Sequence, residues 1–435
     1  MKSPAIGASH SIVTRKVLEN FTTQIYDEKF IDGNRLSVKS FERDRFFTFS
    51  NLIMFMLQKS NGSYKKELNS FFDHLGISPD AFPSASSFCQ ARCKISEKVF
   101  IELNQNAVET FYRHGDFKTW KGHPVLSIDG STLQLPKHET IKKEFGVHGF
   151  GPKADREQSL ARISYLYDSL NGLVINGEMR SYATSEAEMA WDHLKFLKKD
   201  DVVVFDRYYP SKQLMSALKK MGVHFCFKMK TDWWSEVKAF QETSSDDEKV
   251  CFELPAKYKQ WAEENEMPEK FFCRLIKNKN KSGEIEILLT SLLSKERYSH
   301  ADICDLYRKR WEVEEGIKLI KARLDVEEFS GIKSLVVKQD FYCKTLLLTL
   351  NAIMCNQIMP SKEVIQDRVI KVNKTLGLST TKKLFLKLSM DTEIPDLIAY
   401  FTKTISGQFV RSRKGQSTPR NKICHQKFKP NYKTA

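Results

Sequence analysis

The chain has 435 residues, 41% of them hydrophobic, and a formal net charge of +15. This length is ample for a large buried core, in two or three domains or in one domain with insertions. The nine cysteines form no CxxC pair, no apolar run approaches the ~20 residues of a membrane-spanning helix, and the first residues lack the apolar region of a signal peptide. These features argue against zinc-finger, membrane-spanning and secreted proteins, and they predict reduced thiols in the cytosol.

The basic charge favours a polyanionic partner, with nucleic acid ahead of an anionic membrane. A basic protein that is merely soluble is the alternative. The distribution of charge favours a polyanionic partner, because no acidic residue follows Asp396 and the remaining chain predicts a phosphate-binding arm. The nine cationic residues of this arm are Lys403, Arg411, Arg413, Lys414, Arg420, Lys422, Lys427, Lys429 and Lys433.

Residues 1–120 carry helical patterns and are expected to form an α-helical N-terminal domain. Apolar residues recur at helical spacing over 43–58, and an amphipathic pattern over 96–113 begins at Ser96, a residue typical of helix caps. No glycine-rich or proline-rich linker follows, so the expected boundary near 115–122 rests on the change in hydrophobic period.

Residues 121–345 alternate between strand and helix patterns, which predicts an α/β fold with a mixed sheet covered by helices. The clearest local signals are the Asn171-Gly172 turn between two strands and the capping box of Ser185 and Glu188. The expected elements are a strand over 123–136 broken by Gly130, two strands within 161–182, a helix over 185–197, a strand over 201–209, a helix over 210–222 and a strand over 223–230.

A mostly β insertion is expected at about 231–283, and a helical C-terminal region with the basic tail at 346–435. One uninterrupted helix is expected from about Ser299 to Leu324. The strand candidates in this part of the chain are 249–255, 271–279 and 285–293.

Two aspartates stand out by their position in apolar strands. Asp129 precedes Gly130 in a strand rich in Val, Leu and Ile, and Asp206 directly follows Val202–Phe205. A buried ionised carboxylate is costly unless it is paired, capped or bound to metal. Either aspartate alone is commonly a turn cap, whereas two on neighbouring strands suit Mg²⁺ and phosphoryl transfer. Position by itself leaves both interpretations open.

Four residues of the expected long helix share one face, because an α-helix turns by ~100° per residue. Tyr307, Arg310, Glu314 and Lys321 are separated by three, four and seven positions, so they lie within an arc of roughly 60°. A carboxylate beside two cations fits a site for metal and phosphate. A solvated face with an Arg310–Glu314 ion pair is the alternative.

The rest of this helix is expected to divide between core and solvent. Glu312 and Glu315 project ~160° and ~100° away from Glu314, so both are expected at the surface. Gly316 costs ~1 kcal/mol in a helix relative to alanine, and close approach of DNA or of another strand would explain it. The residues expected to dock the helix on the sheet are Trp311, Val313, Ile317 and Ile320.

The spacing Tyr307-x2-Arg310-x3-Glu314-x6-Lys321 matches, without a gap, the Y-(2)-R-(3)-E-(6)-K signature of DDE transposases of bacterial insertion-sequence family four. The resemblance covers roughly residues 50–430. "SIDGSTLQLP" resembles the first-aspartate segment of that family, "FDRYYPSKQL" resembles the second, and "ASSFCQARCKIS" resembles a stretch upstream of the first. A β-rich insertion between the second aspartate and the glutamate is also a trait of the family.

The resemblance implies a ribonuclease-H-like core in which Asp129, Asp206 and Glu314 are catalytic and hold two divalent ions, Mg²⁺ or Mn²⁺. Proteins of this family hydrolyse the transposon ends and then join the freed 3′-OH to target DNA, and close relatives form a hairpin in between. Two metals can activate the attacking oxygen and stabilise the leaving one. The residues implied to contact DNA phosphates are Tyr307, Arg310, Lys321 and Arg207, and for Arg207 a surface salt bridge is the alternative.

The same resemblance implies double-stranded DNA as the partner, both as terminal inverted repeats and as target. The N-terminal helices and the basic tail would hold this DNA, a homodimer would pair two ends, and no membrane partner is expected. The implied setting is the bacterial cytoplasm, at the nucleoid. Relatives stack an aromatic residue of the insertion on a flipped base, and Trp233, Trp234 and Trp261 are the candidates here, although core packing is the commoner role of tryptophan.

Two rival functions remain open from the sequence. One is a catalytically silent, transposase-derived regulator that only binds DNA, against which the intact Asp129, Asp206 and Glu314 argue. The other is a different ribonuclease-H-like nuclease, such as a resolvase.

Overall fold

The computed structural model describes residues 8–42, 46–59, 62–149, 158–280, 283–358 and 368–413. The chain divides into two compact units. The first comprises Met1–Phe117, Leu133–Ala161 and Lys318–Ala435, and the second comprises Lys118–Thr132 and Arg162–Ile317. The chain first passes from one unit to the other after Phe117, within the range of 115–122 where a boundary was expected. It changes unit again after Thr132, Ala161 and Ile317, all inside the expected catalytic range of 121–345.

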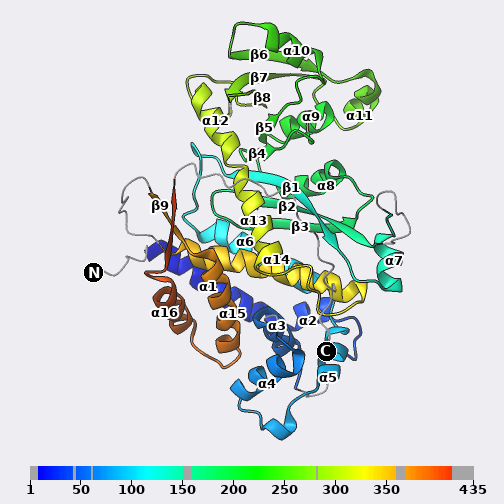
Figure 1. Cartoon of the computed structure of the whole chain (residues 1–435), viewed down its shortest axis with the longest axis vertical. Helices are drawn as coiled ribbons and strands as arrows, with labels where there is room; N and C mark the ends of the chain where they lie inside the picture. Colours follow the sequence, from blue (N-terminus) through cyan, green and yellow to red (C-terminus); the bar gives the residue numbers. More distant parts are fainter. Residues whose placement is uncertain are drawn as a thin grey trace. The chain divides into compact units, whose positions relative to one another are not determined.

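The second unit is built on an eight-stranded sheet (Figure 1). Its strands are β1 (Val125–Gln134), β2 (Leu160–Asp168), β3 (Val174–Ser181), β4 (Val202–Phe205), β5 (His224–Lys228), β6 (Asp247–Glu253), β7 (Lys270–Lys279) and β8 (Ile285–Thr290). They lie in the order β3-β2-β1-β4-β5-β8-β7-β6, in which β1, β4 and β5 are parallel and β8 is antiparallel to β5. The expected α/β fold, a mixed sheet with flanking helices, is confirmed.

The helices of this unit lie between its strands or after the last of them along the chain. They are α8 (Glu186–His193), α9 (Lys212–Lys220), α10 (Ser235–Glu242), α11 (Lys259–Glu264), α12 (His300–Arg308) and α13 (Trp311–Ala322), the last of which continues into the first unit from Lys318 onward. Both sides of the capping box expected at Ser185 and Glu188 are present at the start of α8.

The insertion extends the sheet instead of forming a separate β unit. β6 pairs with β7 and β7 pairs with β8, all antiparallel. The buried Arg274 of β7 fixes this extension, because its guanidinium donates to the Asp247 carboxylate and to the carbonyls of Leu292 and Tyr298. The two strands expected inside the insertion are confirmed as β6 and β7, and the insertion also contains two short helices, α10 and α11, that were not expected.

Helix α12 packs on one face of the sheet. Val125 of β1 and Val204 of β4 belong to the same buried cluster as Tyr307 of α12. Side chains alternate between the two faces along a strand. Phe205, the neighbour of Val204, therefore faces the other way, and its ring stacks on that of Phe227 with 4.5 Å between centroids.

The helix expected from about Ser299 to Leu324 is interrupted, so that expectation was wrong. A tight turn at Lys309 and Arg310 separates α12 from α13. In this turn the Arg310 N–H donates to the Tyr307 carbonyl at 3.2 Å, which is the i→i+3 pattern of a 3₁₀ turn. No glycine or proline marks the turn, so the hydrophobic period could not reveal it.

Two other local expectations were wrong. The helix expected over 43–58 begins only at Phe49, because the hydroxyl of Thr48 caps it by accepting from the Asn51 N–H; residues 43–45 lie outside the described chain. The strand expected to break at Gly130 continues through it as β1.

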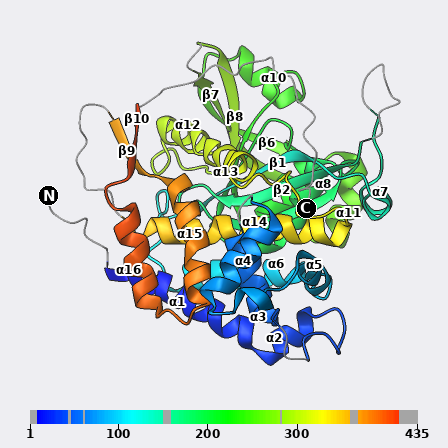
Figure 2. The ribbon, with the colours of Figure 1, turned by 60° about the horizontal axis from the view of Figure 1, so that its bottom comes forward.

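The first unit is helical, and α14 lies at its centre (Figure 2), where it packs against α3, α6 and α15. Its elements are α1 (Ala8–Tyr26), α2 (Glu28–Asn34), α3 (Phe49–Gln58), α4 (Tyr64–His74), α5 (Ala85–Arg92), α6 (Lys98–His114), α7 (Glu139–Phe145), α14 (Ser334–Asn356), α15 (Lys374–Leu388), α16 (Ile394–Ile405) and the antiparallel strands β9 (Arg368–Val372) and β10 (Phe409–Arg413).

A buried ion pair joins α5 to α14 within this unit. Arg92, which is 1% exposed, donates to the Asp340 carboxylate at 2.9 Å and to the Gln339 side chain at 3.0 Å. Burial alone would raise the pKa of Asp340, but the charges of Arg92, Lys59 and Lys344 and the hydrogen bond from Ser330 together outweigh it and hold that pKa well below its usual range. The stretch 85–96, singled out in the sequence, thus has a structural role in the first unit.

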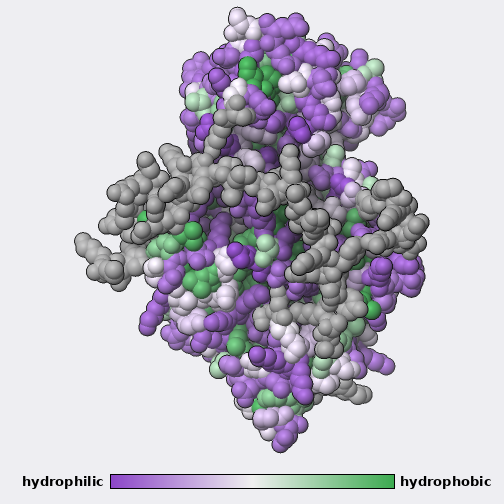
Figure 3. All heavy atoms as spheres, in the orientation of Figure 1, coloured by the Kyte–Doolittle hydropathy of each residue, from purple (hydrophilic) through white to green (hydrophobic). Residues whose placement is uncertain are grey.

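On the face drawn in Figure 3 hydrophilic residues predominate, and a small hydrophobic patch lies over β6 and β7. Phe272 of β7 is 49% exposed. No helix in the described ranges is both long and apolar enough to span a bilayer. The described chain ends at Arg413, so the basic arm from Lys414 onward lies outside it.

Candidate active site

The sheet brings Asp129 and Asp206 to the same level on neighbouring parallel strands. Ser127 of β1 pairs with Val204 of β4, and each aspartate follows two positions later. Neighbouring strands lie ~4.8 Å apart, and side chains two positions apart share a face. Both aspartates therefore belong to the face on which Tyr307 of α12 packs.

Arg310 lies between two of the three expected carboxylates. Its Nη2 donates to Glu314 Oε1 at 2.9 Å, and its Nη1 is 3.7 Å from Asp129 Oδ2. The side chain is only 8% exposed. Burial alone would lower the pKa of Arg310, but the neighbouring Tyr307, Asp206 and Glu314 outweigh it and raise that pKa. The guanidinium is therefore a fixed positive charge among the carboxylates.

Burial and the negative charges of Glu314 and Glu186 keep Asp129 protonated up to an unusually high pH. Burial raises the pKa of Asp129 to about 6, against the lowering effects of the Gly130 N–H and of Arg310, while Glu314 and Glu186 add to the rise. A carboxylate with this pKa gains from a further cation close by, because a positive charge favours the ionised form.

The expected DNA-contacting residues differ in exposure. Tyr307 is 7% exposed within the buried cluster, and burial raises its pKa above the usual range. Arg207 is exposed, and its guanidinium lies over the Tyr208 ring at 5.2 Å from the centroid. Lys321 is half-buried in the last turn of α13 and is counted with the first unit; burial lowers its pKa, and Glu327 partly offsets that effect.

The docking face of α13 is confirmed in part. Val313, Ile317 and Ile320 are at most 8% exposed, as expected. Trp311 is 52% exposed, so its expected docking on the sheet was wrong. Trp311 lies ~200° around α13 from Val313, so the indole lies outside, with the Arg310 guanidinium 5.6 Å from its ring centroid.

Close packing explains Gly316. A Cβ at this position would stand 2.8 Å from Cε2 of Tyr167 on β2, so only glycine lets α13 approach this strand so closely. The negative charges of Glu312 and Glu315 raise the pKa of Tyr167, in addition to the larger effect of burial. Of these two competitors for the third carboxylate, Glu315 is exposed, as expected, and Glu312 is half-buried.

Sequence reasoning missed a group of residues beside the two aspartates. Glu186, the first residue of α8, fills the space over Gly130, and it is one of the charges that raise the pKa of Asp129. Its carboxylate accepts from Arg162 at 3.3 Å and from the hydroxyl of Tyr209 at 3.5 Å. The capping box places Glu186 at the helix start, but no local signal connects it with Asp129.

The donor set suits a hard divalent cation in kind. Asp129, Asp206 and Glu314 offer carboxylate oxygens, the ligands that Mg²⁺ prefers, and the Arg310 cation already contacts two of them. Across the described ranges, however, no three acidic, histidine or cysteine side chains lie close enough together to enclose an ion. Arg310 also carries a buried Nε for which no hydrogen-bond partner is present.

The second unit has an open groove of about 580 Å³, and its lining begins at Arg207, the residue after Asp206. Arg207, Tyr208, Lys228 and Lys230 contribute to its lining. Lys230 Nζ stands 3.8 Å from the ring centroid of Trp233 and 4.8 Å from that of Tyr208, and the two rings are 45% and 58% exposed. The groove therefore presents the Tyr208 ring and cations, together with the carboxylates of Asp232, Glu284 and Glu286, and Trp233 is a neighbour of its Lys230.

The other two tryptophans of the insertion have packing partners. The ring of Trp234 contacts that of Phe252 at 5.7 Å, and Trp261 meets Trp191 edge to face at 6.1 Å. Of the three candidates for base stacking, Trp233 thus presents the most accessible ring.

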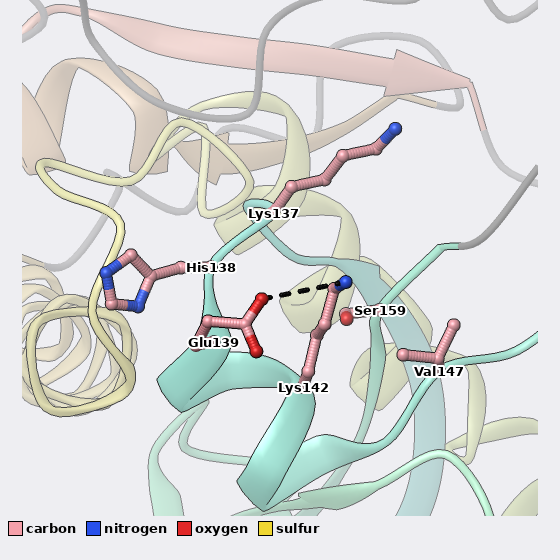
Figure 4. A pocket seen from close by; sticks show the side chains of 6 residues that line it. All are labelled: Lys137, His138, Glu139, Lys142, Val147 and Ser159. Carbon is pink, nitrogen blue, oxygen red and sulfur yellow. Dashed lines mark ion pairs between the residues drawn. The ribbon is translucent and has the colours of Figure 1, made fainter.

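A second, smaller cavity of about 290 Å³ lies in the first unit at the start of α7 (Figure 4). Its lining includes Lys137, His138 and Lys142, and the Lys142 ammonium is 3.7 Å from the Glu139 carboxylate. None of the three expected catalytic carboxylates lines it.

The chain is similar to known proteins in both sequence and fold. The family model described as "Transposase DDE domain" matches residues 120–350. The chain is 21% identical over 348 residues to the transposase InsG of insertion sequence element IS4 from Escherichia coli K12, covering 78% of this chain and 76% of that protein. It is 22% identical over 141 residues to the putative transposase InsZ from the same strain, covering 32% of this chain and 46% of that protein.

A solved structure is also similar to the chain. It is the piggyBac transposase synaptic complex with hairpin DNA, which aligns over 94% of this chain and 88% of that one with a TM-score of 0.47 and 11% identity.

Proposed function

Because the chain belongs to the DDE transposase family, we propose that it cleaves the ends of its own insertion sequence and joins the 3′-OH ends to target DNA. The observation that carries the proposal is the placement of Asp129 and Asp206 on one face of the sheet, with Glu314 connected to Asp129 through Arg310. The parallel pairing of β1 and β4 aligns the two aspartates, and Arg310 contacts both Asp129 and Glu314.

Asp129, Asp206 and Glu314 are proposed as the ligands of two divalent ions, Mg²⁺ or Mn²⁺. Such ions, when bound, supply Lewis-acid stabilisation to the attacking and leaving oxygens of phosphoryl transfer. The chain itself supplies a mostly buried site in which charge interactions are stronger than in water. Arg310 offsets the mutual repulsion of the carboxylates, which would otherwise oppose their convergence.

DNA phosphates near the scissile bond are proposed to contact Arg310, Arg207, Tyr307 and Lys321. The unpartnered Nε of Arg310 is a donor that a phosphate oxygen would satisfy. Arg207 is exposed directly beside Asp206. Pairing of two transposon ends would require two copies of the chain, and the expected bacterial cytoplasmic setting follows from the same function.

Product analysis tests the proposed function directly. Purified protein is incubated with a duplex that carries the terminal inverted repeat, with a target plasmid and with Mg²⁺ or Mn²⁺. Strand cleavage followed by joined transposon–target strands is the expected result. Binding without cleavage would instead identify a DNA-binding regulator, and cleavage of branched DNA alone would identify a resolvase.

Lys321→Ala is expected to weaken binding of the terminal duplex and to lower its salt dependence. Each phosphate contact to a duplex contributes about 0.9 to the slope of log K against log salt. The slope, measured by fluorescence anisotropy at several salt concentrations, should therefore fall by about one unit. Lys318→Ala, which alters an exposed lysine on the same helix, is the matched control. An unchanged slope for Lys321→Ala would rule out a phosphate contact.

Trp233→Ala is expected to impair extrusion of a base at the transposon end. Stacking of a base on an aromatic ring is worth ~1–3 kcal/mol, and the exposed ring beside Lys230 offers such a surface. A 2-aminopurine next to the extruded base loses a stacking partner, so it should brighten with the wild-type protein and remain largely quenched with the variant. Trp261→Ala is the control, because that ring packs on Trp191. Equal brightening with Trp233→Ala and wild type would exclude Trp233 as the stacking residue.

A further inference from the structure

Glu186 is in contact with all three segments that surround the aspartate pair. Its side chain fills the space over Gly130, where a Cβ would lie 2.9 Å from Cδ and 3.0 Å from Cγ of Glu186. Its two carboxylate oxygens accept from Arg162 on β2 and from the hydroxyl of Tyr209 beyond β4. One side chain thus connects the strand of Asp129 with the turn that follows Asp206.

Tyr209 in turn is fixed to Asp206. The Tyr209 N–H donates to the Asp206 carbonyl at 3.2 Å and closes a tight turn that begins at the aspartate. The ring is 2% exposed and packs on Phe205 with 5.7 Å between centroids. Tyr209 therefore connects the carboxylate of Glu186 with the tight turn that begins at Asp206.

On β1, the contact of Glu186 is with Gly130, as its contact beyond β4 is with Tyr209. Gly130 follows Asp129 directly in β1, and a Cβ there would require the Glu186 side chain to shift. Glycine weakens a strand interior unless close approach of another group requires it. The close approach here is that of Glu186, so the glycine and the glutamate together set how near α8 comes to Asp129.

We propose that Glu186, acting through Tyr209 and through its contact with Gly130, is a positioning residue that sets the separation of the Asp129 and Asp206 carboxylates. This inference rests on the proposed function, in which those two carboxylates bind divalent ions. Glu186 receives 3.3 and 3.5 Å hydrogen bonds that are individually weak. The close approach to Gly130, which leaves no room for a Cβ, is the third contact of this side chain.

Three variants in the full-length chain test this role. Tyr209→Phe removes only the hydroxyl, Glu186→Ala removes the acceptor, and Glu186→Gln retains an acceptor oxygen without the charge. The first two are expected to weaken Mn²⁺ binding, measured by calorimetry with MnCl₂ alone, roughly fivefold, which corresponds to a hydrogen bond of ~1 kcal/mol. The Mn²⁺ concentration for half-maximal cleavage should rise in parallel, while the affinity for the terminal duplex and the melting temperature stay close to wild type.

The double variant Glu186→Ala/Tyr209→Phe should be no worse than Glu186→Ala alone, because Glu186→Ala already removes the contact that Tyr209→Phe removes. Glu186→Gln should bind Mn²⁺ within about twofold of the wild type, since its amide oxygen still accepts from Tyr209. Additive losses in the double variant would overturn the coupling. A Glu186→Gln variant as impaired as Glu186→Ala would show that the charge itself is needed, which also overturns a positioning role.

The wild-type protein separates failure of this inference from failure of the proposed function. A wild type that neither binds Mn²⁺ nor cleaves the terminal duplex contradicts the proposed function, whatever the variants do. A wild type that binds and cleaves, with Tyr209→Phe and Glu186→Ala unchanged in Mn²⁺ affinity, contradicts only the positioning role of Glu186.

Discussion

Glu314→Gln should abolish strand cleavage while leaving affinity for the terminal duplex nearly unchanged. Glutamine has the same shape and its amide oxygen can still accept from Arg310, so the fold around the turn is retained. It lacks the negative charge that a divalent cation needs. A loss of several kcal/mol of transition-state stabilisation corresponds to a rate reduction of roughly a thousandfold or more. Single-turnover cleavage on denaturing gels measures the rate, and anisotropy measures binding.

Glu312→Gln and Glu315→Gln are the matched controls for this prediction. Both stand on α13 within two positions of Glu314, and both influence Tyr167, away from Arg310. They should cleave at rates within a few-fold of the wild type. If Glu314→Gln cleaves normally and one of these controls does not, the third carboxylate has been assigned to the wrong residue.

Asp129→Asn should likewise abolish cleavage, yet in the absence of divalent metal it should stabilise the fold at neutral and alkaline pH. Burial raises the pKa of Asp129 to about 6 from an ordinary value of 3.8. Between these values the native state holds a proton that the unfolded chain has released, so the free energy of unfolding falls as the pH rises from about 4 to 6. Above pH 6 the wild type carries the whole cost of an ionised, buried Asp129.

The expected gain from asparagine at pH 8 is of the order of 1–3 kcal/mol, since one pKa unit corresponds to about 1.4 kcal/mol. The gain should disappear below about pH 4, where Asp129 is protonated in both states. Chemical denaturation in EDTA at pH 4, 6 and 8 measures it. Asp232→Asn, at an exposed position, controls for the change in net charge. A variant less stable than the wild type at pH 8 would mean that the Asp129–Arg310 pair outweighs the cost of burial.

The alternation of strands and helices in the second unit follows from local signals. The four apolar residues before Asp206 form β4, the Asn171-Gly172 turn joins β2 to β3 with Gly172 at a φ of +80°, and Ser185 caps α8. Each of these features depends on neighbours within a few residues, through hydrogen bonds and dihedral preferences that belong to the residue types themselves.

The candidate site was predictable only as a set of separate residues. The spacing of Tyr307, Arg310, Glu314 and Lys321 marked the right segment, but the shared helical face assumed an uninterrupted helix. The structure divides that helix at Arg310. Glu314 meets Arg310 within this segment, whereas the contact of Arg310 with Asp129 depends on how β1 packs against it.

The sequence by itself determined which residue types are available for phosphoryl transfer and on which elements they lie: two aspartates in apolar strands and a glutamate on an amphipathic helix. Only the tertiary structure decided that β1 and β4 pair in register, that Arg310 stands between Asp129 and Glu314, and that Glu186 fills the space over Gly130. The physical reason is that periodicity and capping are local, whereas strand register, burial of charge and close approach of side chains depend on residues far apart in the chain.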